Sequence, residues 1–61
     1  MAEHVYIISV KRERGGWTEL LDVEYTTQVE AETAAEEMRI ASKDDLNPIR
    51  WTAVEKFEVL N

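Results

Sequence analysis

The sequence has no cysteine and only one histidine, His4, among its 61 residues. Disulfide bonds are therefore excluded, and a structural zinc site, which takes four Cys or His ligands, is not expected. No apolar run is long enough to cross a bilayer. Residues 1–4 show neither the basic nor the apolar region of a signal peptide. We therefore expect a cytoplasmic protein with no membrane partner.

Basic residues are also absent between Arg14 and Arg39, and seven carboxylates fall inside that gap. Residues 17–47 carry nine acids and two bases, which accounts for the formal net charge of −6. Binding to nucleic acid depends on Lys and Arg side chains that neutralise phosphates. We therefore expect no direct contact with nucleic acid, and instead a protein partner with a basic surface.

The length limits the fold to a single domain, residues 1–61, with one small core. Hydrophobic residues make up 44% of the chain, a composition typical of globular proteins. A domain of this size is marginally stable as a monomer, and oligomerisation is a common remedy. We expect a homo-oligomer, most simply a homodimer.

Two strands are predicted at residues 4–12 and 17–26, because both segments are rich in β-branched and aromatic residues. Gly15-Gly16 between them suits a two-residue hairpin turn. That register brings together five pairs on one face: Tyr6–Tyr25, Ile8–Val23, Val10–Leu21, Arg12–Glu19 and Arg14–Trp17.

A helix is predicted at residues 28–43, because Thr27 and Glu30 have the spacing of a capping box. Helical periodicity places five small or flexible side chains on one stripe: Ala31, Ala34, Ala35, Met38 and Ala41. A third strand is predicted at residues 49–60. Strict alternation would turn Trp51, Ala53 and Phe57 toward the helix and Thr52, Val54 and Lys56 away from it.

The expected fold is therefore α+β, with the order β-β-α-β. The helix returns the chain across the sheet, so the third strand runs antiparallel to the first and can pair beside it. This predicts a three-stranded antiparallel sheet of order 2-1-3 with one helix packed on one face.

No arrangement of residues suggests catalysis, a cofactor or a metal site, so we expect a protein that is not an enzyme. His4 has no evident nucleophile that it could activate as a base, so we expect it to be a surface residue at a strand end. Asp44-Asp45 lacks the spacing of a calcium loop. Of the two tryptophans, Trp17 at the hairpin end is a candidate binding anchor. Trp51 is expected in the core.

Two surfaces go beyond what the fold needs. The first is the outer face of the helix, a candidate partner-binding site made of Glu32, Glu36, Glu37, Val29 and Ile40. The second is the open sheet face, a candidate self-association surface made of Val5, Ile7, Leu20 and Val54. In the helical set, Glu32 and Glu36 form a like-charge i,i+4 pair, which a sequence selected for helix stability alone would avoid.

The favoured hypothesis is a small acidic protein-interaction protein that presents its acidic surface to a basic partner. Small acidic chains without cysteine are common among phage and mobile-element proteins that bind host factors. A more specific form of this hypothesis is nucleic-acid mimicry, in which Asp22 and Glu24 take the place of phosphates. The alternative is a structural dimerisation or assembly module whose charge serves only solubility. A protein that binds small molecules or metals is disfavoured, since so small a core leaves little room for a pocket.

Overall fold

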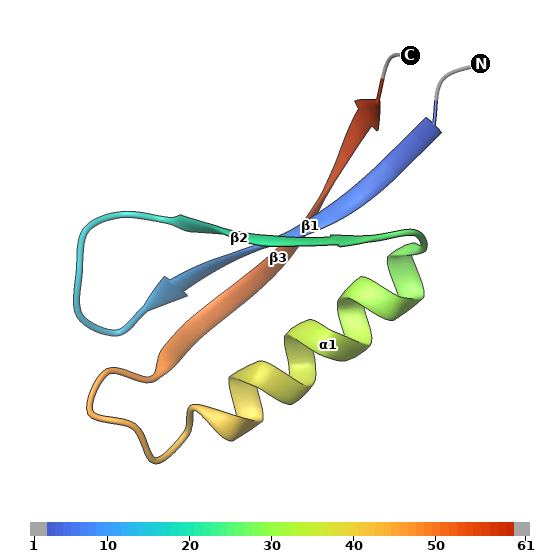
Figure 1. Ribbon diagram of the computed structural model, residues 1–61. Coiled ribbons are helices and arrows are strands. Elements are labelled where there is room, and N and C mark those ends of the chain that lie inside the picture. The colour runs from blue at the N-terminus through green and yellow to red at the C-terminus, as the bar shows by residue number, and fades with distance from the viewer. Residues whose placement is uncertain (1–2, 60–61) are drawn as a thin grey trace.

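The fold combines a three-stranded sheet with a single helix (Figure 1). The structure is a computed structural model that describes residues 3–59. Its elements, in chain order, are β1 (Glu3–Arg12), β2 (Glu19–Tyr25), α1 (Gln28–Ala41) and β3 (Ile49–Val59). The sheet has the order β2-β1-β3 with both pairings antiparallel, which confirms the predicted α+β fold. The predicted end of the third strand, residue 60, lies outside the described residues.

The hydrophobic core lies between α1 and one face of the sheet. Its buried members come from β1, α1 and β3: Ile8, Val10, Ala31, Ala35 and Ile49. Among the described residues, only Ile8 and Val10 are large side chains with less than 2% exposure, and both belong to the central strand. A central strand should be the most apolar one, because it has neighbours on both edges and the helix above it.

The predicted small-residue stripe forms the face of α1 that touches the sheet. Ala31 and Ala35 are buried, and Ala34 and Met38 pack against the core. Ala41, the last predicted member, is exposed. Short side chains at these positions let the helix axis approach the sheet closely, which suits a core filled mainly from the strands.

Both ends of α1 have side-chain caps. At the N-terminus the Thr27 hydroxyl accepts a hydrogen bond from the Glu30 N–H at 3.2 Å, as the capping-box pattern predicts. The Glu30 carboxylate accepts instead from the Thr26 hydroxyl at 3.4 Å. At the C-terminus the buried Ser42 hydroxyl donates to the Arg39 carbonyl at 2.9 Å and accepts from the Ile49 N–H at 3.0 Å. Ser42 thus joins the end of the helix to the start of β3.

The hairpin register is confirmed at one end and wrong at the other. Tyr6 faces Tyr25 as predicted, but Val10 faces Glu19 rather than Leu21. The shift arises because three residues of β2, 21–23, lie opposite the single residue Ile8, a bulge that alternation does not reveal. The predicted Arg12–Glu19 and Arg14–Trp17 pairings are lost with it.

The connection between β1 and β2 is therefore a loop of residues 13–18 and not a two-residue turn. This loop is held by the segment before β3. The Asn47 side chain accepts from the Arg14 N–H at 2.7 Å and donates to the Arg14 carbonyl at 3.0 Å. The Glu13 N–H donates to the Pro48 carbonyl at 2.9 Å, and the Arg12 guanidinium donates to the Asn47 carbonyl at 2.9 Å. Two loops far apart in sequence thus stabilise each other.

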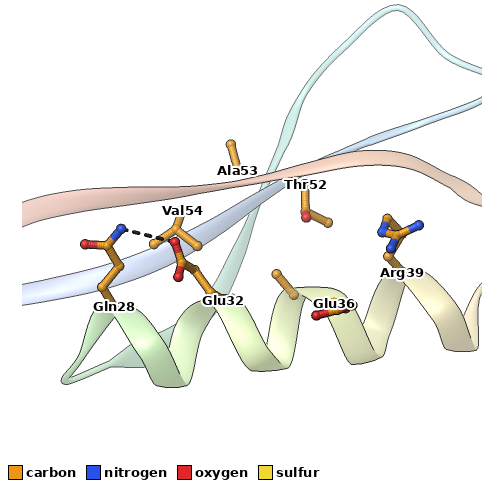
Figure 2. Close-up of a pocket in the computed structure, with 8 residues that line it drawn as sticks. Gln28, Glu32, Glu36, Arg39, Thr52, Ala53 and Val54 are labelled. Carbon is orange, nitrogen blue, oxygen red and sulfur yellow. Dashed lines mark hydrogen bonds between the residues drawn. The ribbon is translucent and has the colours of Figure 1, made fainter.

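The facing of β3 is opposite to the prediction over most of its length. Ile49 lies opposite Arg12 and Trp51 opposite Lys11, so Arg50 is an extra residue in a second bulge. Ile49 points into the core, and the bulge then reverses the alternation that follows it. Thr52 and Val54 point toward α1 and Ala53 points away (Figure 2).

Trp51 therefore does not lie in the core. It is 38% exposed on the sheet face away from α1, and Phe57, opposite Val5 on the same face, is 40% exposed. Val54 takes the place predicted for Trp51 and packs against the core. The self-association set predicted from the sequence is thus corrected: Val54 leaves the open face, and Trp51 and Phe57 join it.

Replacing Ser42 by alanine should lower the free energy of unfolding by about 1–3 kcal/mol, because the buried Ile49 N–H would lose its acceptor. Urea denaturation followed by circular dichroism measures the change. Thr33→Ala, which removes a hydroxyl from an exposed position of α1, is the matched control and should change stability by less than about 0.5 kcal/mol. Equal effects in the two variants would contradict the role assigned to Ser42.

Replacing Val54 by alanine should lower the free energy of unfolding by about 1–2 kcal/mol, since apolar surface packed against the core is lost. Val29→Ala removes the same atoms from a side chain that is 72% exposed and should be nearly neutral. The comparison also tests the facing of β3. With the alternation predicted from the sequence, Val54 would lie on the open face and both variants would behave alike.

Candidate functional site

The predicted partner-binding residues lie together on the outer side of α1. All five members of this acidic helix face are exposed: Val29, Glu32, Glu36, Glu37 and Ile40. Glu32 and Glu36 stand one turn apart on the flank of the helix nearest β3, and Glu37 projects farther round the helix. Helical periodicity was enough to find this set, because the alanine stripe fixes which side faces the sheet.

A cleft runs between that flank of α1 and β3 (Figure 2). This α1–β3 cleft has a volume of about 300 Å³. Gln28 and Glu32 point from the helix toward the strand, and the Gln28 amide donates to the Glu32 carboxylate at 3.1 Å. The eight lining residues are Gln28, Glu32, Ala35, Glu36, Arg39, Thr52, Ala53 and Val54.

The carboxylates in the cleft have no salt-bridge partner within residues 3–59. The one contact of salt-bridge geometry in that range places His4 Nε2 3.5 Å from Glu58 Oε1, across β1 and β3. Arg39 lines the cleft without approaching Glu36 closely enough to form an ion pair. Glu32 and Glu36 therefore add their negative charge to a concave surface, where a cationic group would be attracted.

The outer edge of β3 borders the cleft. In the sheet order β2-β1-β3, β3 has a partner strand on one side only. The other flank of α1, with Ala34 and Met38, packs inward against the core, so the cleft opens past the free edge of β3. Such an edge presents N–H and C=O groups that can pair with another chain.

The open sheet face is the second candidate surface. The pairings place Val5, Ile7 and Leu20 on it, as predicted, together with the residues that sequence reasoning missed, Trp51 and Phe57. The alternation of β3 placed Trp51 and Phe57 on the wrong face, because the bulge at Arg50 reverses it. As the structure has it, the open sheet face comprises Val5, Ile7, Leu20, Trp51, Ala53 and Phe57.

The remaining candidates are surface residues. His4 is a partly exposed residue near a strand end, as expected. Trp17 is exposed, and its ring lies over Gly15, whose φ of +124° suits glycine. Asp44-Asp45 is exposed after α1, and no group of three or more potential metal ligands occurs within residues 3–59.

Among the described residues there is no helix with both the length and the apolar character needed to cross a membrane. Comparison of the chain with protein-family models, with curated proteins and with solved structures found no match. The features that bear on function are therefore the α1–β3 cleft, the acidic helix face and the open sheet face.

Proposed function

We propose that this protein is a small, non-enzymatic interaction protein that binds a basic, extended segment of a partner protein in the α1–β3 cleft. The observation that carries the proposal is the position of Glu32 and Glu36. Both carboxylates lack a salt-bridge partner among the described residues, and both lie beside a sheet edge that is free to pair.

The spacing of the two carboxylates matches an extended chain. Four residues along a helix correspond to a rise of about 6 Å. In an extended segment, side chains on one face repeat about every 6.4–6.8 Å. Lys or Arg side chains at alternate positions of a bound segment can therefore meet Glu32 and Glu36 at the same time.

The backbone of such a segment has a place to bind as well. A peptide that adds to a sheet edge gains affinity from main-chain hydrogen bonds and specificity from alternate side chains. Here the edge is that of β3, and the side chains that turn toward α1 would meet the acidic flank of the helix. The exposed Val29 and Ile40 lie outside the cleft lining and offer apolar surface on the outer side of α1.

Charge complementarity of this kind acts mainly on association rate and on the choice of partner, and it weakens as salt rises. The proposed interaction should therefore be sensitive to salt. Mimicry of nucleic acid finds less support in the geometry. Asp22 lies within the bulge of β2, so it and Glu24 do not repeat at regular strand spacing.

A fluorescein-labelled peptide as long as β3, with lysine and valine alternating, is a direct probe of the cleft. We expect Glu32→Lys with Glu36→Lys to weaken its binding by about tenfold or more, since two exposed attractions worth ~0.2–1 kcal/mol each become repulsions. Fluorescence anisotropy at about 0.05 M and 0.5 M salt measures the dissociation constant and its dependence on screening.

The matched control is Asp44→Lys with Asp45→Lys, which changes the net charge equally at exposed positions outside the cleft lining. Its effect should be much smaller. A second control peptide has the same composition with its lysines adjacent instead of alternating. Equal losses in the two double variants, or equal binding of the two peptides, would refute binding in the cleft.

A further inference from the structure

The open sheet face has no covering element among residues 3–59. The helix α1 packs on the opposite face, where Ile8, Val10 and Val54 point. On the open side, Val5 faces Phe57 and Lys11 faces Trp51 across the β1–β3 pairing. Five of the six side chains of this face are larger than alanine, and they form a layer over both β1 pairings.

This face is already shielded at its centre. Ser9 lies on it, between Leu20 and Ala53, yet is only 3% exposed. Its hydroxyl donates to the Ala53 carbonyl at 3.4 Å, so burial leaves no polar atom of Ser9 without a partner. The neighbouring side chains therefore shield the sheet backbone here and present a mainly apolar outer surface.

The exposed area of the chain is too large for a compact monomer. The accessible surface is 4767 Å², whereas a folded monomer of 7.1 kDa exposes about 4100 Å². The radius of gyration is 12.6 Å, against about 10.5 Å for a compact domain of this length. The chain is elongated, with extents of 43 × 22 × 13 Å, and exposes more surface than a compact fold of its mass. A second copy can cover such surface, since each partner in a standard interface buries ~800 Å².

We infer that a second copy of this chain covers the open sheet face, giving a homodimer of two sheets packed face to face. Sheets pack in this way about 10 Å apart, with side chains of the two inner faces interdigitated. A two-fold axis lets the same surface serve both copies. The interface lies on the opposite side of the sheet from the acidic helix face, so the dimer does not depend on the proposed function.

Charge selects the orientation of the two copies. Ile7 lies between Glu24 on β2 and Glu55 on β3, while Lys11 lies at the far end of β1 beside Trp51. Glu24, Ile7 and Glu55 form an acidic row across the three strands. If the strands of the two copies ran parallel, the acidic row of one copy would face the acidic row of the other. In the antiparallel arrangement, Lys11 and Trp51 of one copy instead cover the acidic row and the Val5–Phe57 pair of the other.

Sedimentation velocity at about 100 µM protein tests the dimer, because mass action favours association at high concentration. The expected mass is twice the 7.1 kDa of the chain. Phe57→Glu should convert the protein to a monomer. Leu46→Glu adds the same charge at a loop residue that is 94% exposed and should leave the dimer intact. A monomeric wild type, or equal behaviour of the two variants, would overturn the inference.

A charge swap tests the orientation, and it remains informative if Phe57→Glu fails to fold. Lys11→Glu should weaken the dimer, and adding Glu55→Lys should restore it. Within one chain these residues stand four strand positions apart, about 13 Å, so they do not form a pair there. A double variant that dissociates as readily as Lys11→Glu alone would rule out the antiparallel arrangement.

The same measurement separates this inference from the proposed function. Glu32→Lys with Glu36→Lys should leave the dimer unchanged, since both residues lie on α1, across the sheet from the interface. Phe57→Glu, where it folds, should still bind the lysine-valine peptide. Loss of the dimer in the helix variant would count against an interface on the open sheet face.

Discussion

A single helix covers one face of a three-stranded sheet, and the rest of the structure depends on that limit. With 14 residues, α1 is about 21 Å long, enough to cover the middle of β1 and β3 but not the second face of the sheet. The fully buried core is accordingly small, and within residues 3–59 its only large members are Ile8 and Val10. A core of this size gives only a small free energy of unfolding, because net stability is a small difference between large opposing terms.

Polar contacts between distant loops compensate for part of what the core lacks. Ser42 links the end of α1 to β3, and Asn47 links the β1–β2 loop to the segment before β3. Both side chains satisfy backbone groups that would otherwise have no partner in the protein. They also tie the start of β3 to the end of α1 and to the β1–β2 loop.

The topology and the helix face could be predicted from the sequence, because they follow from features that repeat or that have local chemistry. Thr27 starts α1, and the alanine spacing fixes its inner face. The two β-bulges could not be predicted. The two extra residues opposite Ile8 and the one extra residue at Arg50 disturb only local pairing, and nothing in the strand sequence favours one position strongly. β3 has apolar residues on both faces, so alternation alone could not assign Trp51 and Val54. The acidic face was thus found from periodicity, whereas the cleft and the open sheet face needed the register.

The two proposed surfaces are compatible because they lie on opposite sides of one sheet. In a face-to-face dimer the two open sheet faces are buried at the centre, and each α1 lies on an outer layer with its own α1–β3 cleft. The acids near Ile7 then serve the interface with Lys11 of the other copy, while Glu32 and Glu36 stay exposed. A partner with two basic segments could bind both clefts, and the second contact would gain from a high effective concentration only if its linker spans the dimer. Each contact alone would be weak and sensitive to salt. A dimer would therefore bind most tightly those partners whose two basic segments are spaced to reach both clefts.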